Sequence, residues 1–252
     1  MNNEKKVIYG LKKIPISDKR QKISSLFEEV SNDYDKMNDI MSLGTHRIWK
    51  RDLVSRLKRE QLSLNKKNIL DLAGGTGDIA FSVKKLFPNN QITIMDLTIG
   101  MMKVGKQKAF QQKFNDGIHW VAGDSAYLPF SDNSFNNITC AFGIRNVAEV
   151  KKTLESCYKV LKPGGKLMIL EFSPEVIIPF QKFYEYYLNN IIPFLGAKVA
   201  NNKKAYQYLT ESIETFYTPD VFSGMIESVK FKMIKLKKYS SGIACLYIAT
   251  RI

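Results

Sequence analysis

Between residues 69 and 172 the chain alternates short apolar runs with amphipathic stretches. The runs are five to eight residues long, which is typical of buried strands, and lie at residues 69–73, 91–95, 118–122, 135–142 and 166–172. The stretches between them carry apolar residues at helical spacing and lie at residues 79–86, 98–114 and 147–161. This alternation of strand and helix predicts a doubly wound, mainly parallel sheet.

The end of the chain departs from this alternation. Residues 231–238 and 243–250 each have the composition of a strand, and only residues 239–242 separate them. Because this connection is too short for a crossover helix, the two strands must form an antiparallel hairpin. A dinucleotide-binding fold would repeat its parallel half instead, so the terminal hairpin favours the methyltransferase variant of the fold.

Residues 1–60 precede the first of these strands. Residues 1–17 are rich in lysine and show little periodicity, so a mobile or loosely docked leader is expected. Helices are predicted from about Ser17 and up to Lys58, and helices in this position commonly form a lid over a cofactor pocket. Residues 61–252 are expected to form the rest of a single structural domain, with a helical insertion at about 174–217.

The insertion begins with an aromatic stripe. Its residues follow helical spacing and are Phe180, Phe183, Tyr184, Tyr187, Leu188, Ile191 and Ile192. Such a stripe more commonly packs on the core of its own domain. A face so rich in aromatic residues could instead line a channel for a lipid tail or rest at a membrane interface.

Residues 69–80 join a strand, a glycine turn and the start of a helix. Gly74, Gly75 and Gly77 lie where the backbone turns sharply and where a ligand would approach main-chain N–H groups. Such a turn at the carboxyl end of a sheet is typical of a nucleotide-type cofactor site. These residues fit both the dinucleotide fingerprint and the looser glycine turn of S-adenosylmethionine (SAM) enzymes, so they leave the cofactor open.

Acidic residues end the next two strands. Asp96 follows the strand after the glycine turn, where a carboxylate would bind ribose hydroxyls with either cofactor. Asp124, with Ser125 beside it, stands at the tip of the third strand. There its carboxylate could accept a hydrogen bond from an exocyclic amine such as that of adenine.

Composition excludes several classes of protein. The 252 residues are 44% hydrophobic, enough for one substantial core, and no apolar run reaches the roughly 18 residues of a membrane-spanning helix. The N-terminus has neither the apolar region of a secretory signal nor the bias of a transit peptide. Cys140, Cys157 and Cys245 are expected to be reduced core residues of a cytosolic protein. Two histidines and no C-x-x-C motif predict no metal site.

The net charge of +14 is the unusual bulk property. It suits a polyanionic neighbour, either nucleic acid or an anionic membrane surface. A lysine-rich solvated surface explains it equally well. The net charge alone therefore does not identify a partner.

Longer motifs resemble the ubiquinone/menaquinone C-methyltransferase family. One family signature is similar to residues 34–38 (Tyr-Asp-Lys-Met-Asn) with Ser42, His46 and Trp49, and the other is similar to residues 159–173. Further similar blocks lie at residues 71–78, 142–146, 199–201 and 206–213, so the resemblance runs from about residue 9 to the C-terminus. Lys159 stands where arginine is usual, and Ala141 where some members carry serine.

The resemblance implies a class I methyltransferase fold. This fold is α/β and Rossmann-like, with a seven-stranded sheet, an antiparallel C-terminal hairpin and an N-terminal helical lid. It implies that SAM is the methyl donor and that Gly74 and Thr76 contact it in the glycine turn. Asp96 would bind the ribose hydroxyls of SAM. Asp124 and Ser125 would hold its adenine.

The implied reaction methylates a ring carbon of a polyprenylated quinol, either a 2-methoxy-6-polyprenyl-1,4-benzoquinol or a demethylmenaquinol. A phenolic hydroxyl has a pKa of about 10, so a cation that stabilises the phenolate would lower the barrier. Arg145 is the first candidate for this catalytic role, with a structural loop contact as the equal alternative. His46 is the second candidate, as a base or as a donor to a quinol oxygen. Packing of His46 against Trp49 is its alternative.

The implied partners are the polyprenyl quinol, an anionic membrane surface and other enzymes of quinone biosynthesis, with a homodimer left open. The expected location is the cytoplasm, peripherally on the inner face of the membrane, or the matrix side in a mitochondrion. An RNA methyltransferase is one alternative, but no RNA-binding module is visible and Cys140 lacks a preceding proline, so nucleic acid is not an expected partner. A non-catalytic scaffold with a SAM fold is another, and the intact glycine turn and Asp96 argue against it.

Overall fold

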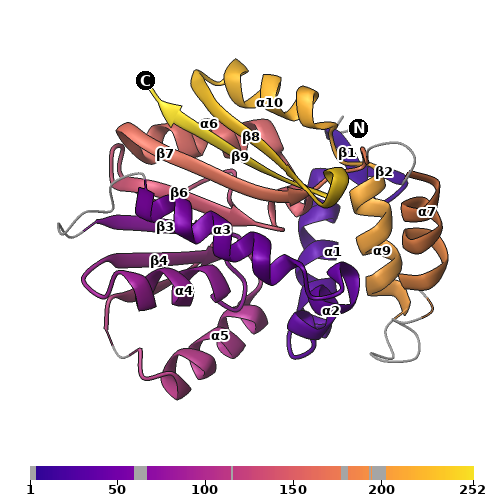
Figure 1. The fold of residues 1–252 in the computed structure, drawn as a ribbon, viewed down its shortest axis with the longest axis horizontal. Helices are drawn as coiled ribbons and strands as arrows, with labels where there is room; N and C mark the ends of the chain where they lie inside the picture. The colour runs from indigo at the N-terminus through magenta and orange to yellow at the C-terminus, as the bar shows by residue number, and fades with distance from the viewer. Residues whose placement is uncertain (1–3, 60–66, 115, 177–180, 193, 195–202) are drawn as a thin grey trace.

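The computed structural model describes residues 4–59, 67–114, 116–176, 181–192, 194 and 203–252. A seven-stranded sheet with the order β5-β4-β3-β6-β7-β9-β8 runs through its centre (Figure 1). The strands are β3 (Asn68–Leu72), β4 (Gln91–Asp96), β5 (Ile118–Ala122), β6 (Phe135–Ala141), β7 (Leu161–Phe172), β8 (Phe231–Tyr239) and β9 (Ala244–Arg251). Strands β3 to β7 pair in parallel, and β9 pairs antiparallel with both β7 and β8. The structure thus confirms the parallel alternation and the terminal hairpin, whose strands are joined by the 3₁₀ turn η3 (Ser240–Gly242).

Strand β7 begins earlier than the sequence predicted. Leu161 already pairs with Phe135, and the next pair, Lys166 with Asn137, follows after an irregularity in the register. Residues 162–165 bulge out between these two pairs, and Gly164 takes a left-handed conformation there (φ 75°). The Pro-Gly-Gly sequence therefore does mark a turn, but the turn lies inside the strand.

Helices cover both faces of the sheet and bury a hydrophobic core on each. One face carries α3 (His46–Arg59), α4 (Asp78–Leu86) and α5 (Ile99–Gln111), and the other carries α6 (Val150–Val160) and α10 (Pro219–Ser228). Leu53 and Leu57 of α3 are fully buried, so this N-terminal helix forms part of the layer over the sheet. Cys140, Cys157 and Cys245 are buried and free, as predicted for core cysteines.

A third group of helices lies beyond the carboxyl ends of the parallel strands, at the right of Figure 1. It contains α1 (Ile16–Glu29), α2 (Tyr34–Ser42), α7 (Gln181–Tyr186), the π-helical turn η2 (Tyr187–Ile191) and α9 (Lys203–Glu214). Tyr184, Leu188 and Ile192 of the aromatic stripe are buried in the core, which favours the packing interpretation over a membrane-facing one. Phe180 and the side chain of Phe183 lie outside the described residues. No helix in the described ranges is long and apolar enough to cross a membrane.

Residues 6–15 differ from the expected mobile or loosely docked leader. Strands β1 (Lys6–Tyr9) and β2 (Lys12–Pro15) pair as an antiparallel hairpin. Tyr9 stacks on Tyr208 of α9 with ring centroids 4.7 Å apart, and the Leu11 N–H donates to a Glu211 carboxylate oxygen at 3.4 Å. Strands of only four residues are too short to give a clear periodic pattern, so the sequence did not reveal them.

Candidate active site

A cavity opens where the strands β3, β4, β5 and β6 end. Parallel strands bring their carboxyl ends to one edge of a sheet, so residues distant in sequence meet there. The cavity wall includes Gly75 from the glycine turn, Asp96 from the end of β4, and Asp124 with Ser125 after β5. The structure therefore brings together three of the predicted cofactor residues. The other two, Gly74 and Thr76, line a smaller adjoining cavity.

The glycine turn requires its glycines for two different reasons. Gly77 has φ 88°, a left-handed conformation that side chains disfavour. Gly74 instead lies close to its neighbours. A Cβ there would stand 2.8 Å from Ile94 and 2.9 Å from Asp71 Oδ2. The turn can therefore fold tightly against the strand ends, and its backbone remains open to a ligand.

The carboxyl of Asp71 fixes the glycine turn through hydrogen bonds. Its Oδ1 accepts a hydrogen bond from the Thr139 hydroxyl (2.8 Å), and its Oδ2 accepts one from the Ala80 N–H (3.2 Å). The carboxyl thus links β3 to β6 and to the first turn of α4. Burial raises the pKa of Asp71 to about 7, despite these hydrogen bonds.

Asp96 faces the cofactor cavity and is tied to the glycine turn. Its Oδ2 accepts the Gly75 N–H at 2.9 Å, and its Oδ1 accepts the Thr98 N–H at 2.8 Å. Burial raises the pKa of this carboxyl. Each oxygen keeps a second lone pair for hydroxyl donors, so the geometry fits the ribose of a nucleoside cofactor.

Asp124 is held by a residue that the sequence did not single out. Arg20 Nε of α1 lies 2.6 Å from Asp124 Oδ2, and Arg20 Nη2 lies 2.8 Å from Glu149. Asp124 Oδ1 accepts the Ala126 N–H at 2.9 Å. Helix α1 therefore closes one side of the cavity through an ion pair, and Arg20 is part of the cavity wall.

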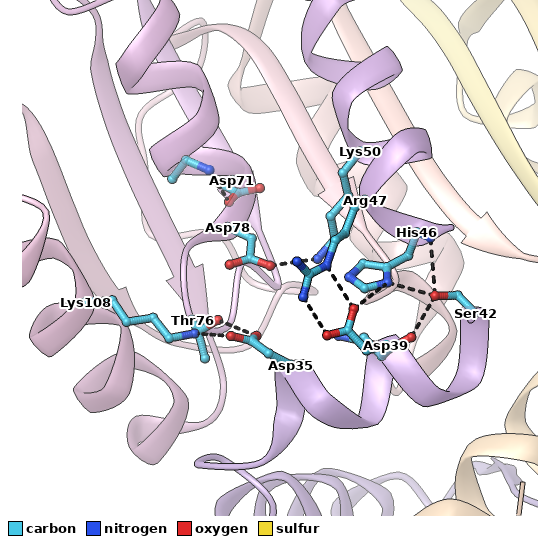
Figure 2. Close-up of polar contacts among 12 residues, drawn as sticks. Asp35, Asp39, Ser42, His46, Arg47, Lys50, Asp71, Thr76, Asp78 and Lys108 are labelled. Atoms are coloured by element: carbon cyan, nitrogen blue, oxygen red, sulfur yellow. Dashed lines mark hydrogen bonds and ion pairs between the residues drawn. The ribbon is translucent and has the colours of Figure 1, made fainter. Parts of the chain in front are cut away.

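Polar contacts also join α2 and α3 to the glycine turn (Figure 2). Lys50 of α3 pairs with Asp78 at 3.0 Å, and the Lys50 side chain is only 13% exposed. Asp35 of α2 pairs with Lys108 of α5 and accepts a hydrogen bond from the Thr76 hydroxyl at 3.4 Å. The hydroxyl of Thr76 thus points toward helix α2, which covers the glycine turn.

His46 lies at the corner between α2 and α3 (Figure 2) and lines neither cavity at the glycine turn. Ser42 Oγ lies 2.7 Å from His46 Nδ1 and donates its proton to the Asn38 carbonyl at 2.7 Å. Burial lowers the pKa of His46 to about 4, so the ring is neutral at pH 7.

Arg145 lies in the 3₁₀ turn η1 (Ile144–Asn146) after β6 and is 5% exposed. Its Nη1 donates to Glu171 at 2.7 Å and to the Phe142 carbonyl at 2.8 Å, and its Nε donates to Ser212 at 3.3 Å. The structure thus places Arg145 in a buried ion pair and outside the wall of the cofactor cavity. Glu171 was missed as a partner, although an acid inside the apolar run of β7 is a sequence signal for such a pair.

Two non-glycine residues in the cavity wall have left-handed backbones. Ala73 follows β3 with φ 50°, and Phe142 follows β6 with φ 58°. This conformation costs free energy in residues with a Cβ and occurs often at functional sites. A Cβ on the next residue, Gly143, would stand 2.6 Å from the Ala73 Cβ, so the two loops pack in direct contact. The sequence carried no sign of this strain.

The strand order is that of the class I methyltransferase fold, and the match to a methyltransferase family shows that the chain is a SAM-dependent methyltransferase. A SAM-dependent methyltransferase from Aquifex aeolicus has a TM-score of 0.58 and 16% identity, with 80% of this chain and 90% of that chain covered. The [4+2]-cyclase SpnF has a TM-score of 0.67 and 11% identity, with 92% and 96% covered. At such low identity these likenesses show the fold alone.

The chain belongs to the ubiE/COQ5 methyltransferase family, whose model matches residues 16–251. A protein from a Ruegeria species, described as ubiquinone/menaquinone biosynthesis C-methyltransferase UbiE, is 40% identical over 244 residues. The match covers 97% of this chain and 96% of that protein. The resemblance of the motifs to this family is thereby confirmed.

Proposed function

We propose that this protein transfers a methyl group from SAM to a ring carbon of a polyprenylated quinol in ubiquinone or menaquinone biosynthesis. The observation that carries the proposal is the similarity to a C-methyltransferase of this biosynthesis along 97% of the chain. The cavity supports it, because its acids and glycine turn fit a nucleoside donor.

The residues around the cavity have separable roles in the proposed reaction. When bound, SAM supplies an electrophilic methyl group, whose transfer to the ring leaves S-adenosylhomocysteine and releases one ring proton. Asp96 would hold the ribose, and Asp124 with Ser125 would hold the adenine. Gly74 and Thr76 would contact the donor in the glycine turn. Helices α1 and α2 would exclude water from the bound donor.

The contacts of Arg145 support a positioning role in this reaction. Its charge is balanced by Glu171, and its hydrogen bond to the Phe142 carbonyl holds the loop that walls the cofactor cavity. Direct proton transfer by His46 would require the α2–α3 corner to move, because the ring lies outside both cavity walls. We therefore propose that His46 fixes that corner.

The proposed reaction is tested with methyl-labelled SAM and purified protein. Both a 2-methoxy-6-polyprenyl-1,4-benzoquinol and a demethylmenaquinol are offered in reduced form, and the labelled ring is identified by mass spectrometry. We expect label in the ring of at least one quinol. Stoichiometric SAM binding without label in either quinol would favour a non-catalytic scaffold. Label in RNA alone would favour an RNA methyltransferase.

A further proposal concerns where in the cell the protein binds its quinol substrate. A polyprenyl tail resides in the bilayer, and the chain carries a net charge of +14. We propose that lysines bind the protein peripherally to the inner, anionic face of the membrane, at about 1 kcal/mol for each lysine near the surface. Vesicle flotation should show binding to anionic lipid that weakens at high salt. Equal recovery with neutral lipid would contradict the electrostatic attraction.

A further inference from the structure

A second cavity lies between β1, α1, η1 and α9. It shares Val147 and Ala148 with the cofactor cavity, so the two cavities adjoin. Its remaining wall combines apolar and hydroxyl-bearing side chains with cations, among them Val7, Ile8, Tyr208, Ser212, Thr215 and Phe216. A concave site that combines apolar walls with polar groups able to orient a ligand is typical of a small-molecule pocket.

Lys19 of α1 lines this second cavity and has an unusual environment. The residue is only 6% exposed, and no acid within the described residues acts on the charge of its side chain. Lysine almost always keeps its ammonium group in water or beside an acid. Burial lowers the pKa of Lys19 to about 8, because no acid compensates for the lost water. Its side chain is largely buried and lines the cavity, and no acid of the described residues compensates the ammonium charge.

The other charged groups of the second cavity do not supply that partner. Three cations, Lys6, Lys19 and Arg145, line it, and no carboxylate does so in the part of the chain that the structure describes. Arg145 is already neutralised by Glu171 at 2.7 Å, whereas Lys6 is exposed to water. Lys19 is thus the largely buried cation of this cavity without a compensating acid, which favours an anionic or partly anionic ligand.

Helix α1 separates the two cavities with consecutive residues. Arg20 lines the cofactor cavity and pairs with Asp124, and Lys19 lines the second cavity. A ligand in the second cavity would therefore lie beside the methyl donor, across Val147 and Ala148. The position suits the molecule that receives the methyl group.

We propose that the second cavity receives the aromatic ring of the methyl acceptor and that Lys19 hydrogen-bonds a ring oxygen and stabilises it as a phenolate. This inference rests on the proposed function, since it gives the acceptor of that reaction its site. Tyr208 and Phe216 provide aromatic walls for the ring. The hydroxyl proton leaves to water at the cavity mouth, and Lys19 stays protonated as the hydrogen-bond donor. The phenolate oxygen raises the electron density of the adjacent ring carbon.

The first test compares Lys19→Met with Lys22→Met, which removes an exposed lysine from the same helix. We expect Lys19→Met to lower kcat/KM for the quinol by about tenfold or more, because a charge-assisted hydrogen bond is lost. Lys22→Met should leave kcat/KM unchanged, and both variants should bind SAM in calorimetry as the parent does. Lys19→Arg, which keeps the charge, should recover part of the activity. Unchanged kcat/KM in a folded Lys19→Met variant would overturn the proposal.

Folding is checked on the same variants by thermal unfolding. Replacing a largely buried lysine that has no acidic partner with an apolar side chain of similar length should leave the midpoint unchanged or raise it. A lost activity in Lys19→Met can then be assigned to the site. A lowered midpoint would show that Lys19 has a stabilising partner and would overturn the description of a lysine without a compensating acid.

The second test needs no turnover, so it separates this inference from the proposed reaction. A chromogenic nitrophenol is titrated with the SAM-saturated protein, and its absorbance reports ionisation. We expect the bound phenol to ionise at lower pH than the free phenol, and Lys19→Met to abolish this shift. Equal ionisation with both proteins overturns the role of Lys19. A Lys19-dependent shift without methylation of any quinol contradicts the proposed function alone.

Discussion

The two adjoining cavities are built in different ways. The cofactor cavity takes its wall mainly from loops that follow neighbouring parallel strands, and its contacts are short, such as the 2.9 Å bond from the Gly75 N–H to Asp96. The second cavity is assembled from the N-terminal hairpin, α1, η1 and α9. Its supports join distant parts of the chain, such as Tyr9 with Tyr208 and Arg145 with Ser212.

This difference separates two properties of the enzyme. The sheet fixes the donor site, because hydrogen-bonded strands hold their own ends in place. The acceptor side depends on how the hairpin and the insertion pack onto those ends. Substitutions in the first region should therefore act on SAM affinity, and those in the second on stability and on turnover.

The largest effect is expected at the ion pair that supports the second cavity. Glu171, which is fully buried, balances Arg145, so Glu171→Ala leaves a buried arginine without its partner. We expect a loss of about 3–5 kcal/mol in the free energy of unfolding, measured with urea. Glu171→Gln keeps the shape and a carbonyl acceptor, so its loss should be smaller. A cost of less than about 1 kcal/mol for Glu171→Ala would show that this pair does not support the region.

Asp96→Ala tests the donor side. Losing the carboxylate contact with ribose should weaken SAM binding by about 1.5–3 kcal/mol, or tenfold and more, while the fold is kept. Calorimetric titration gives the affinity, and circular dichroism checks the fold. Asp132→Ala, an exposed acid outside the cofactor cavity wall, serves as the control. Unchanged SAM affinity in folded Asp96→Ala would remove this residue from the site.

The raised pKa of Asp71 predicts how the stability of the donor side depends on pH. Its folded pKa is raised to about 7, whereas an unfolded aspartate titrates at about 3.9. Between pH values of about 4 and 7 the unfolded chain therefore binds fewer protons at Asp71 than the folded chain does. The Asp71 contribution to stability is present below about pH 4 and is lost as pH rises to about 7. The slope is at most about 1.4 kcal/mol per pH unit. Asp71→Asn should remove this component from urea titrations, and an identical pH profile would contradict it.

The smallest effect is expected at the corner of α2 and α3. Arg47 pairs with Asp39 at 2.6 Å, but the arginine side chain is 62% exposed. Arg47→Ala should change the free energy of unfolding by less than about 1 kcal/mol. Lys50→Met, at the buried pair with Asp78, should cost more and also weaken SAM binding, because it frees the glycine turn from its cover. Equal losses in the free energy of unfolding for the two variants would show that burial does not decide how much these ion pairs contribute.

The sequence by itself determined the sheet and the donor side. Strand and helix periods are local, and chain connectivity forces parallel strands from 69 to 172 and a hairpin at the end. Those two facts place Asp96 and Asp124 at one edge of the sheet before any coordinates are known. The main differences between the structure and the prediction from sequence are also local. Strand β7 begins before its turn, and the strands of the hairpin at residues 6–15 are too short to show a period.

Only the tertiary structure decided the second cavity. Lys19 stands four residues before Ile23 and eight before Phe27, on the apolar face of the predicted helix, and this position was the signal that it is buried. Whether such a lysine is paired with an acid or lines a cavity depends on the elements that pack around it. The Arg145–Glu171 pair and the Tyr9–Tyr208 stack likewise join residues from separate elements. Contacts of this kind leave no period in the sequence, because each is fixed only when the chain has folded.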